Sequence, residues 1–295
     1  MTTITKGFMG EISWVTESAY GDGVSTASVL SLIANQVQAV KLGRNTPLGE
    51  TRNIGSYDVS AFIRGVKMYG LTTEYYQDRN YTTADILYKE IKRVTNELAS
   101  VAFQVAVGKD QTTATWFNLK GCRAKTITVS TEEDGPFKVS IDWSVKDVAT
   151  STAKTVSCTD SITTAPKSFV GGSFKRGASA TWGYVVGSAT VTIDNGLQEV
   201  KDIGNTTLID AVPGARKITG SVNVCLTDGG AAYWAEVTNG SSDAIELDFG
   251  ATSNDPSIRF TSAIIGSLEI PLDSDSAIVM TTVPFTGTQV EFEAA

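Results

Sequence analysis

An eight-residue motif that occurs twice constrains the fold of this chain more than any other sequence feature. The motif reads Leu48-Gly-Glu50-Thr-Arg52-Asn53-Ile54-Gly55 and returns as Leu197-Gln-Glu199-Val-Lys201-Asp202-Ile203-Gly204. Two further matches follow in the same order, Gly65–Thr72 with Ala215–Val222 and Phe103–Gly108 with Ile245–Gly250. Three ordered matches predict two divergent copies of one domain of about a hundred residues. The alternative is that similar alternating strands recur by chance in a β-rich protein.

The repeat divides the chain into four parts. The two copies are predicted as domains at residues 35–147 and 186–295, with an N-terminal arm at 1–34 and a linker at 148–185. The arm mixes aromatic residues with Gly and has no periodicity, so we expect it to lie on other protein surface. Ser, Thr and Ala dominate 148–172, a composition typical of a linker, and its length suggests that it drapes over a surface.

Hydrophobic alternation predicts a similar set of strands in each copy. The expected strands are 37–42, 66–76, 101–107, 116–119, 126–130 and 138–145, then 187–193, 218–226, 244–249, 258–261, 266–270 and 277–285. The motif segments, 44–60 and 194–213, have the composition of loops. The fold class predicted is therefore mainly β, with two tandem sandwich or barrel domains.

One helix is predicted to flank each of these domains. In the first copy it begins near Thr82 or Thr83, and an apolar stripe follows. The stripe consists of Leu87, Ile91, Val94 and Leu98. In the second copy a shorter helix is expected at 231–237.

Residues that carry catalysis or bind metals are scarce. The chain has no histidine, the commonest general base and metal ligand. No nucleophile or phosphate-binding motif occurs, and Asp273-Ser-Asp275 lacks the Gly and Glu of a calcium loop. Cys122, Cys158 and Cys225 are widely spaced, which favours reduced thiols. We therefore expect no enzyme, no cofactor and no metal.

The tryptophans offer a second kind of candidate site. A row of them can line a sugar-binding surface, but places in or beside predicted strands favour packing in a core or interface. The four considered are Trp116, Trp143, Trp182 and Trp234.

Charge is distributed unevenly along the chain. Residues 186–295 carry four basic and fifteen acidic side chains, a net of −11, which leaves +3 on the rest because the total is −8. Nucleic-acid binding needs cations that replace phosphate counterions, so the sign is wrong for a binder. No apolar run approaches the ~18 residues of a membrane span. The first residues lack a signal-peptide pattern, so assembly in a cytoplasm is expected.

The order of elements resembles the major tail tube proteins of long-tailed viruses of bacteria or archaea. The resemblance rests on an arm that ends in Tyr20-Gly21, on Lys217–Val224 followed by a helix, and on the closing stretch Ile278–Thr286. It is strongest over 195–287 and weaker over 37–147. The resemblance implies a structural protein of the virion tail, whose rings stack into a hollow tube for the genome. It also implies tail tip or baseplate, terminator and tape-measure proteins as partners.

The runner-up function is a surface β-sandwich module, such as a carbohydrate-binding or adhesin domain. Negative-stain microscopy separates the two, since a tube protein gives rings or tubes and the module gives compact particles. An enzyme ranks third.

Two surfaces are expected to serve a tube. The repeated motif is predicted to stack successive rings through Leu48, Glu50, Arg52, Asn53, Ile54, Leu197, Glu199, Lys201, Asp202 and Ile203, because it matches better than the strands around it. The alternative is that Glu50 and Arg52 brace their own loop. The acidic second copy predicts an acidic lumen along which DNA slides without sequence-specific binding, with Glu246 and Asp248 as candidates on one strand face.

The duplication also predicts the symmetry. Six places are common in rings of this family, so three double chains would close a ring with threefold and approximate sixfold symmetry. The competing arrangement has six chains, with one copy of each displayed outside.

Overall fold

The computed structural model describes residues 11–293 apart from internal gaps. The gaps are residues 26–27, 29, 34–35, 52–60, 78–85, 92–96, 109–113, 133–134, 159–172, 177–179, 182–185, 203, 227–233, 235–236, 241, 249–256, 268 and 270–278. We call residues 11–158 the first half and residues 173–293 the second half.

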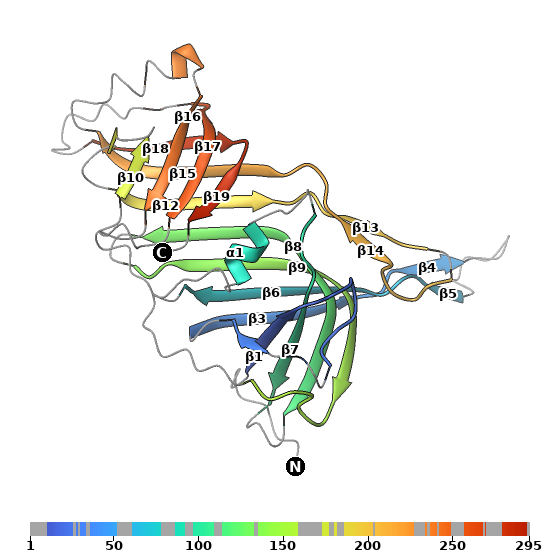
Figure 1. Cartoon of the computed structure of the whole chain (residues 1–295). Helices are drawn as coiled ribbons and strands as arrows, with labels where there is room; N and C mark the ends of the chain where they lie inside the picture. The colour runs from blue at the N-terminus through green and yellow to red at the C-terminus, as the bar shows by residue number, and fades with distance from the viewer. Residues whose placement is uncertain are drawn as a thin grey trace.

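Strands dominate both halves, as predicted (Figure 1). The first half contains β1 (Ile12–Thr16), β2 (Ser31–Leu32), β3 (Gln36–Asn45), β4 (Leu48–Thr51), β5 (Ala61–Arg64), β6 (Met68–Tyr76), α1 (Ile86–Ile91), β7 (Val101–Val107), β8 (Thr115–Glu132) and β9 (Lys138–Ser151). The second half contains β10 (Ser173–Arg176), β11 (Ala180–Thr181), β12 (Val186–Asp194), β13 (Gln198–Val200), β14 (Asp210–Val212), β15 (Lys217–Leu226), β16 (Ser242–Asp248), β17 (Ser257–Ile265), β18 (Val279–Gly287) and β19 (Val290–Glu293).

One layer of antiparallel strands runs without interruption through both halves. Its order is β3-β6-β9-β8-β12-β15-β18, and we call it the spanning sheet. The halves meet where β12 pairs with β8 over seven positions, from Ser188 opposite Glu132 to Asp194 opposite Thr126. The halves are therefore joined by a ladder of paired strands and not only by the connecting chain.

Shorter layers complete the structure. In the first half, β2, β1 and β7 continue from the N-terminal part of β8. In the second half, β11, β10, β16, β17 and β19 pair in succession. Alternate residues of the spanning sheet point into the core, for example Val139, Ile141 and Val191, all at most 1% exposed.

The main core is an apolar cluster that draws on both halves, and Ala106, Ala114 and Trp116 form a second, small cluster. It includes Phe103 and Trp143 of the first half, whose rings meet edge to face with centroids 4.9 Å apart. In the second half, Phe260 packs on Phe285 with centroids 5.1 Å apart. Burial of such side chains is the main stabilising term of the fold.

The second half repeats the pairing order of the first. Strands β12, β15, β18, β17, β16, β10 and β11 pair in the same order as β3, β6, β9, β8, β7, β1 and β2. A hairpin, β4–β5 or β13–β14, follows the first of these strands in each half. The order is consistent with a duplication, which stays a prediction.

The helices are described only in part. Within α1, Leu87 and Ile91 are buried as the predicted stripe requires, and α1 contacts β19 of the second half. Thr82, Thr83 and Val94 lie outside the described residues. In the second half, residues 234 and 237–239 are helical.

Several strands differ from their predicted bounds. The segments 116–119 and 126–130 belong to one strand, β8, of 18 residues. It bends at Gly121, which has φ +62°, and at an irregularity between Ala124 and Thr126. The strand predicted at 266–270 is wrong where it is described: β17 ends at Ile265, and Gly266, Ser267 and Glu269 are not in a strand.

The arm and the linker both contribute to the sheets. From the arm, β1 pairs with β7, and Ile12 and Trp14 are in the core. From the linker, residues 148–151 continue β9, and Ser173–Arg176 pairs with β16. β1 and β10 were not predicted as strands, because each is a short outlying strand whose partner lies far away in sequence.

Two of the four candidate tryptophans are buried, as the prediction that they pack in a core requires. Trp116 and Trp143 are at most 3% exposed, and the indole N–H of Trp143 donates to the hydroxyl of Thr73 at 3.0 Å. Trp234 is exposed, and Trp182 lies outside the described residues. All three cysteines are free thiols.

Candidate assembly interface

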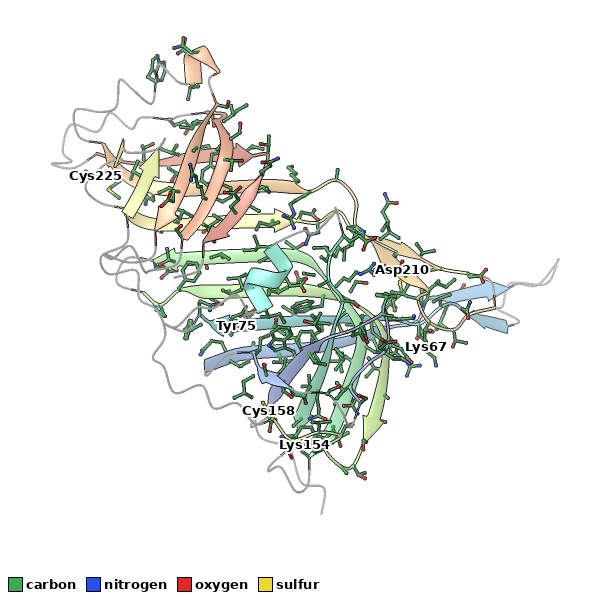
Figure 2. The ribbon with its side chains drawn as sticks, viewed as in Figure 1. Lys67, Tyr75, Lys154, Cys158, Asp210 and Cys225 are labelled. Atoms are coloured by element: carbon green, nitrogen blue, oxygen red, sulfur yellow. The ribbon has the colours of Figure 1, made fainter. Side chains whose placement is uncertain are left out.

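Two hairpins lie side by side beyond one end of the spanning sheet (Figure 1). They are β4–β5 and β13–β14, and Lys67 and Asp210 lie near their bases (Figure 2). The backbone N–H of Lys67 donates to the carbonyl of Thr206 at 2.9 Å, which joins the base of one hairpin to the turn of the other. The ammonium of Lys201 also lies 3.0 Å from the sulfur of Met68.

The repeated motif begins on a hairpin strand in each half. Leu48–Thr51 forms β4, and Gln198–Val200 forms β13. The prediction that 44–60 and 194–213 are loops is therefore wrong at these strands and at β14, and β5 lies just beyond the first of these segments. Their polar, Gly-rich composition concealed strands too short to show an alternating pattern.

The hairpins expose apolar side chains. Leu48 is 59% exposed and Val212 45%, and Val200 and Ile209 are also exposed. These are four of the seven large apolar side chains that stand exposed in the described part of the chain. Apolar side chains gathered on a projecting element are typical of a protein–protein contact.

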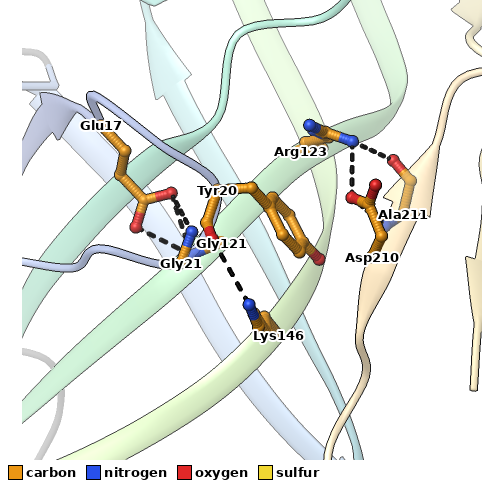
Figure 3. A network of polar contacts seen from close by, with 8 residues as sticks. All are labelled: Glu17, Tyr20, Gly21, Gly121, Arg123, Lys146, Asp210 and Ala211. Carbon is orange, nitrogen blue, oxygen red and sulfur yellow. Dashed lines mark hydrogen bonds and ion pairs between the residues drawn. The ribbon is translucent and has the colours of Figure 1, made fainter. Parts of the chain in front are cut away.

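An arginine of the first half holds the second hairpin in place (Figure 3). Arg123 on β8 donates from Nη1 to the Asp210 carboxylate at 2.9 Å and to the Ala211 carbonyl at 2.6 Å. The Arg123 side chain is only 15% exposed. Its guanidinium also lies 4.5 Å from the centre of the Tyr20 ring. A charge-assisted contact in a partly desolvated place is stronger than an exposed ion pair.

Tyr20 belongs to a turn of the N-terminal segment that is fixed by one carboxylate. The side chain of Glu17 accepts hydrogen bonds from the backbone N–H groups of Gly21, Gly23 and Gly121, at 2.8 to 3.1 Å. Lys146 donates to the carbonyl of Tyr20 at 3.3 Å (Figure 3). Burial raises the pKa of the Tyr20 phenol, and the nearby Asp210 carboxylate raises it further.

Glu199 of the repeated motif makes a contact within the chain. Its carboxylate accepts a hydrogen bond from the Ser144 hydroxyl on β9 at 3.0 Å, and the Lys201 ammonium is 4.0 Å away. Glu199 can therefore stabilise its own hairpin within the chain and also take part in a contact between stacked rings.

The remaining stacking candidates are only partly described. Leu197 is half-buried before β13, while Glu50 and Asp202 are exposed. The Asp202 carboxylate accepts a hydrogen bond from the Asn205 amide at 3.3 Å. Four candidates lie outside the described residues, namely Arg52, Asn53, Ile54 and Ile203.

Comparison with known proteins agrees with this architecture. A family model described as phage tail tube protein matches residues 7–287. The chain belongs to the phage tail tube protein family. A search of the curated proteins finds no match. The family is one of structural tail proteins and not of enzymes, so the chain has a structural role in the tail of the virion.

The two candidates for the lumen of this tail tube protein lie on β16, outside the spanning sheet. The strand register puts Glu246 directly opposite Lys175 on β10 and Arg259 on β17. Asp248 stands opposite Ser173 and Ser257. Glu246 therefore has basic neighbours on both sides.

Neither a metal site nor a membrane span is found where the tail tube protein is described. No cluster of three or more acidic or cysteine side chains that could hold a metal ion occurs among these residues. None of the described helical segments has the length and apolar character needed to cross a membrane.

No sequence pattern pointed to Arg123, Asp210 or Ser144, and Tyr20 entered only as the end of the N-terminal arm. Arg123 and Asp210 are 87 positions apart, and a pair of opposite charges at that separation is unremarkable in any sequence. Only the fold brings them together.

Proposed function

We propose that the chain forms rings of three subunits that stack into a hollow tail tube, through which viral DNA passes. The observation that carries this proposal is the continuity of the spanning sheet from β3 to β18. Because β8 and β12 are paired, both halves must belong to the same wall. A six-chain ring that displays one half outside would need this ladder to break.

Each chain would contribute two similar units to the ring. The shared pairing order of the two halves and the repeated motif support a duplication, with domains near 35–147 and 186–295. Three chains then give true threefold and approximate sixfold symmetry.

The lateral edges of the spanning sheet supply a means of ring closure. Among the described residues, β3 pairs only with β6, and residues 279–284 of β18 pair only with β15. Open edges favour addition of a strand from another chain. In the duplicated arrangement β3 corresponds to β12, which already lies beside a strand of the preceding unit. Because β8 corresponds to β17 in the pairing order, we infer that β3 of one chain adds to its neighbour at the edge where β17 and the open part of β18 lie.

The size of such a ring suits DNA. Three chains with seven spanning strands each give roughly 21 strands, which at a spacing of about 4.8 Å and a tilt of about 40° form a wall about 40 Å across. This leaves a bore wide enough for a duplex. Six chains with both halves in the wall would make it about twice as wide.

Successive rings would meet at the hairpins. Leu48, Val200, Ile209 and Val212 would be covered by the next ring, and Glu50, Arg52, Glu199 and Lys201 would pair with charges across it. Exposed pairs contribute under about 1 kcal/mol each, but a ring repeats them.

The other components of the tail would bind the same surfaces. The first and last rings must contact tail tip or baseplate and terminator proteins, and the lumen must hold a tape-measure protein before DNA passes. Assembly would take place in the host cytoplasm.

Counting the chains in one ring tests the proposal. Purified protein is assembled, and tubes are imaged by cryo-electron microscopy while single discs are weighed by native mass spectrometry. Three chains per ring are expected. Six chains per ring would overturn the proposed threefold symmetry. Compact particles without rings would overturn the proposal that the chain polymerises into a tube.

A further inference from the structure

We propose that the face of the spanning sheet that turns away from the core lines the lumen, and that it does so as a neutral surface of hydroxyl groups past which duplex DNA slides. This inference rests on the proposed tube. It replaces the expectation that Glu246 and Asp248 of β16 form the lumen wall.

Hydroxyl side chains form continuous rows on this face. One row runs across five strands, from β9 through β8, β12 and β15 to β18, with directly opposed residues Ser140, Thr128, Thr192, Thr219 and Thr286. All five are half-buried or exposed. The row crosses the β8–β12 junction, so both halves present the same chemistry.

Two parallel rows extend the same surface. The second consists of Ser130, Thr190 and Ser221, and the third of Ser188, Asn223 and Thr282. Their neighbours along the strands, such as Val129, Val191 and Val222, are buried. Strand alternation therefore separates an apolar core face from a hydroxyl face.

Charged side chains of both signs lie toward the margins of this face, and one of them, Glu132, is directly opposite Ser188. Glu74 lies between two lysines, with its carboxylate 3.0 Å from the Lys138 ammonium and 3.8 Å from that of Lys41. Asp142 accepts a hydrogen bond from the Thr72 hydroxyl at 2.6 Å. The register also places Asp194 directly opposite Lys217. The face thus carries mixed charge at its margins and hydroxyls across its middle.

The other layers are less suited to a lumen. In the part of the chain that the structure describes, the layer that contains β7 and the layer that contains β16 are joined to each other through the spanning sheet alone. In the first half the outer side of β7 is also covered, because Gln104 bonds with the backbone of Thr155 and Val156. Among the described residues, the spanning sheet is the layer that continues through both halves, and the hydroxyl rows of its outer face are half-buried or exposed.

A hydroxyl wall has a clear physical consequence for DNA. Binding to the phosphate backbone depends on cations that displace condensed counterions. Short neutral side chains provide hydrogen-bonding partners for water but no such cation. A duplex would therefore find no favoured stopping position along the tube.

Thiol accessibility tests which face lies inside. Cysteine is introduced as Thr192→Cys on the hydroxyl face or as Ser157→Cys on the covering segment, in a background with Cys158→Ala and Cys225→Ala. Each variant is treated with N-ethylmaleimide or with maleimide coupled to a globular protein wider than the bore.

The two reagents should distinguish the positions. In tubes, N-ethylmaleimide should modify both cysteines, while the protein-coupled reagent should modify Thr192→Cys at least tenfold more slowly than it does in free subunits. Its rate with Ser157→Cys should change less than threefold on assembly. Equal rates at Thr192→Cys in tubes and in subunits would overturn the lumen assignment and leave the tube intact. Absence of tubes from the unmodified protein would overturn both proposals.

A second experiment tests the chemistry of the wall. Tubes of the Thr192→Lys, Thr219→Lys double variant should retain a short fluorescent DNA duplex on sedimentation at least tenfold more than unmodified tubes at low salt, and the difference should vanish at high salt. The Thr192→Asn, Thr219→Asn variant is the neutral control and should behave like the unmodified protein. Retention by unmodified tubes equal to that of the lysine variant would overturn the neutral-wall proposal.

Discussion

At the scale of single residues, Arg123 connects three parts of the chain that are far apart in sequence. It contacts the ring of Tyr20 from the N-terminal segment, and it bonds Asp210 and the Ala211 carbonyl of the second hairpin. Lys146, 4.7 Å from the centre of the same ring, completes the cluster. The orientation of the hairpin therefore depends on a few contacts with the first half.

Loss of the Arg123 charge should destabilise the subunit measurably. We expect Arg123→Met to lower the free energy of unfolding by about 2–3 kcal/mol, because the Asp210 carboxylate loses its partner and the Ala211 carbonyl its donor. Urea denaturation of unassembled subunits measures the change. Lys120→Met, which removes the more exposed Lys120–Asp147 pair, is the matched control and should cost less than about 1 kcal/mol. Equal losses in the two variants would contradict a special role for Arg123.

Cys122 should make stability fall in alkaline solution. Complete burial raises the pKa of its thiol, and the carboxylates of Glu17 and Glu90 raise it further. Because the folded state holds this proton more tightly than the unfolded chain, its contribution is fully present below the thiol's unfolded pKa and is lost as pH rises above it. Cys122→Ala should therefore lose less unfolding free energy between pH 7 and pH 10 than the unmodified protein does. Urea denaturation at each pH measures this loss. Val129→Ala, a core change on the same strand without a titrating group, should lower stability and keep the original pH slope. An unchanged slope in Cys122→Ala would refute the assignment.

At the scale of elements, the two hairpins differ from the other strands in what they expose. The strands of the sheets bury alternate side chains, whereas Leu48, Val200, Ile209 and Val212 stand in solvent. Each hairpin has only one short strand pair and so has little core of its own. Their shape and exposed apolar groups suit a contact made on assembly.

Charge reversal in the hairpins should stop the tube from growing. The Glu50→Lys, Glu199→Lys double variant is expected to give folded subunits or single rings that do not elongate, since each ring would meet the next with altered charge at repeated positions. Tube lengths in electron micrographs provide the measurement. Ser144→Ala removes only the partner of Glu199 within the chain and should leave tube length unchanged. Tubes of normal length from the double variant would count against stacking through the motif.

At the scale of the whole molecule, the subunit is more unified than a pair of domains joined by a linker. The spanning sheet passes from one half to the other at β8–β12, and the core cluster includes residues of both halves. Residues at the end of the first half also bind back to its start, since Lys154 pairs with Glu11 at 2.6 Å. Separating the halves would expose a long sheet edge and part of the core.

A single unfolding transition is expected for the unassembled subunit. Calorimetry should give a van't Hoff enthalpy equal to the calorimetric enthalpy. Val139→Ala in the first half and Val222→Ala in the second should each shift this same transition to lower temperature, each costing about 2 kcal/mol. Two separate transitions, each sensitive to only one of the variants, would show that the halves unfold independently.

The sequence by itself determined the class of fold and the place of most strands. Alternation of polar and apolar residues predicted β7, β12 and β15 because it reflects burial on one side of a strand, which is a local property. The repeated motif drew attention to the two hairpins, and the order of elements suggested the family to which the chain belongs.

Tertiary structure decided the features that depend on distant partners. β1 and β10 could be recognised only through β7 and β16, because their own residues show no clear period. The sequence predicted separate strands at 116–119 and 126–130, yet pairing with β9 carries β8 through Gly121 as one bent strand. The contact of Arg123 with Asp210 and the alignment of hydroxyls across β8 and β12 depend on strand register, which long-range pairing sets and local sequence does not.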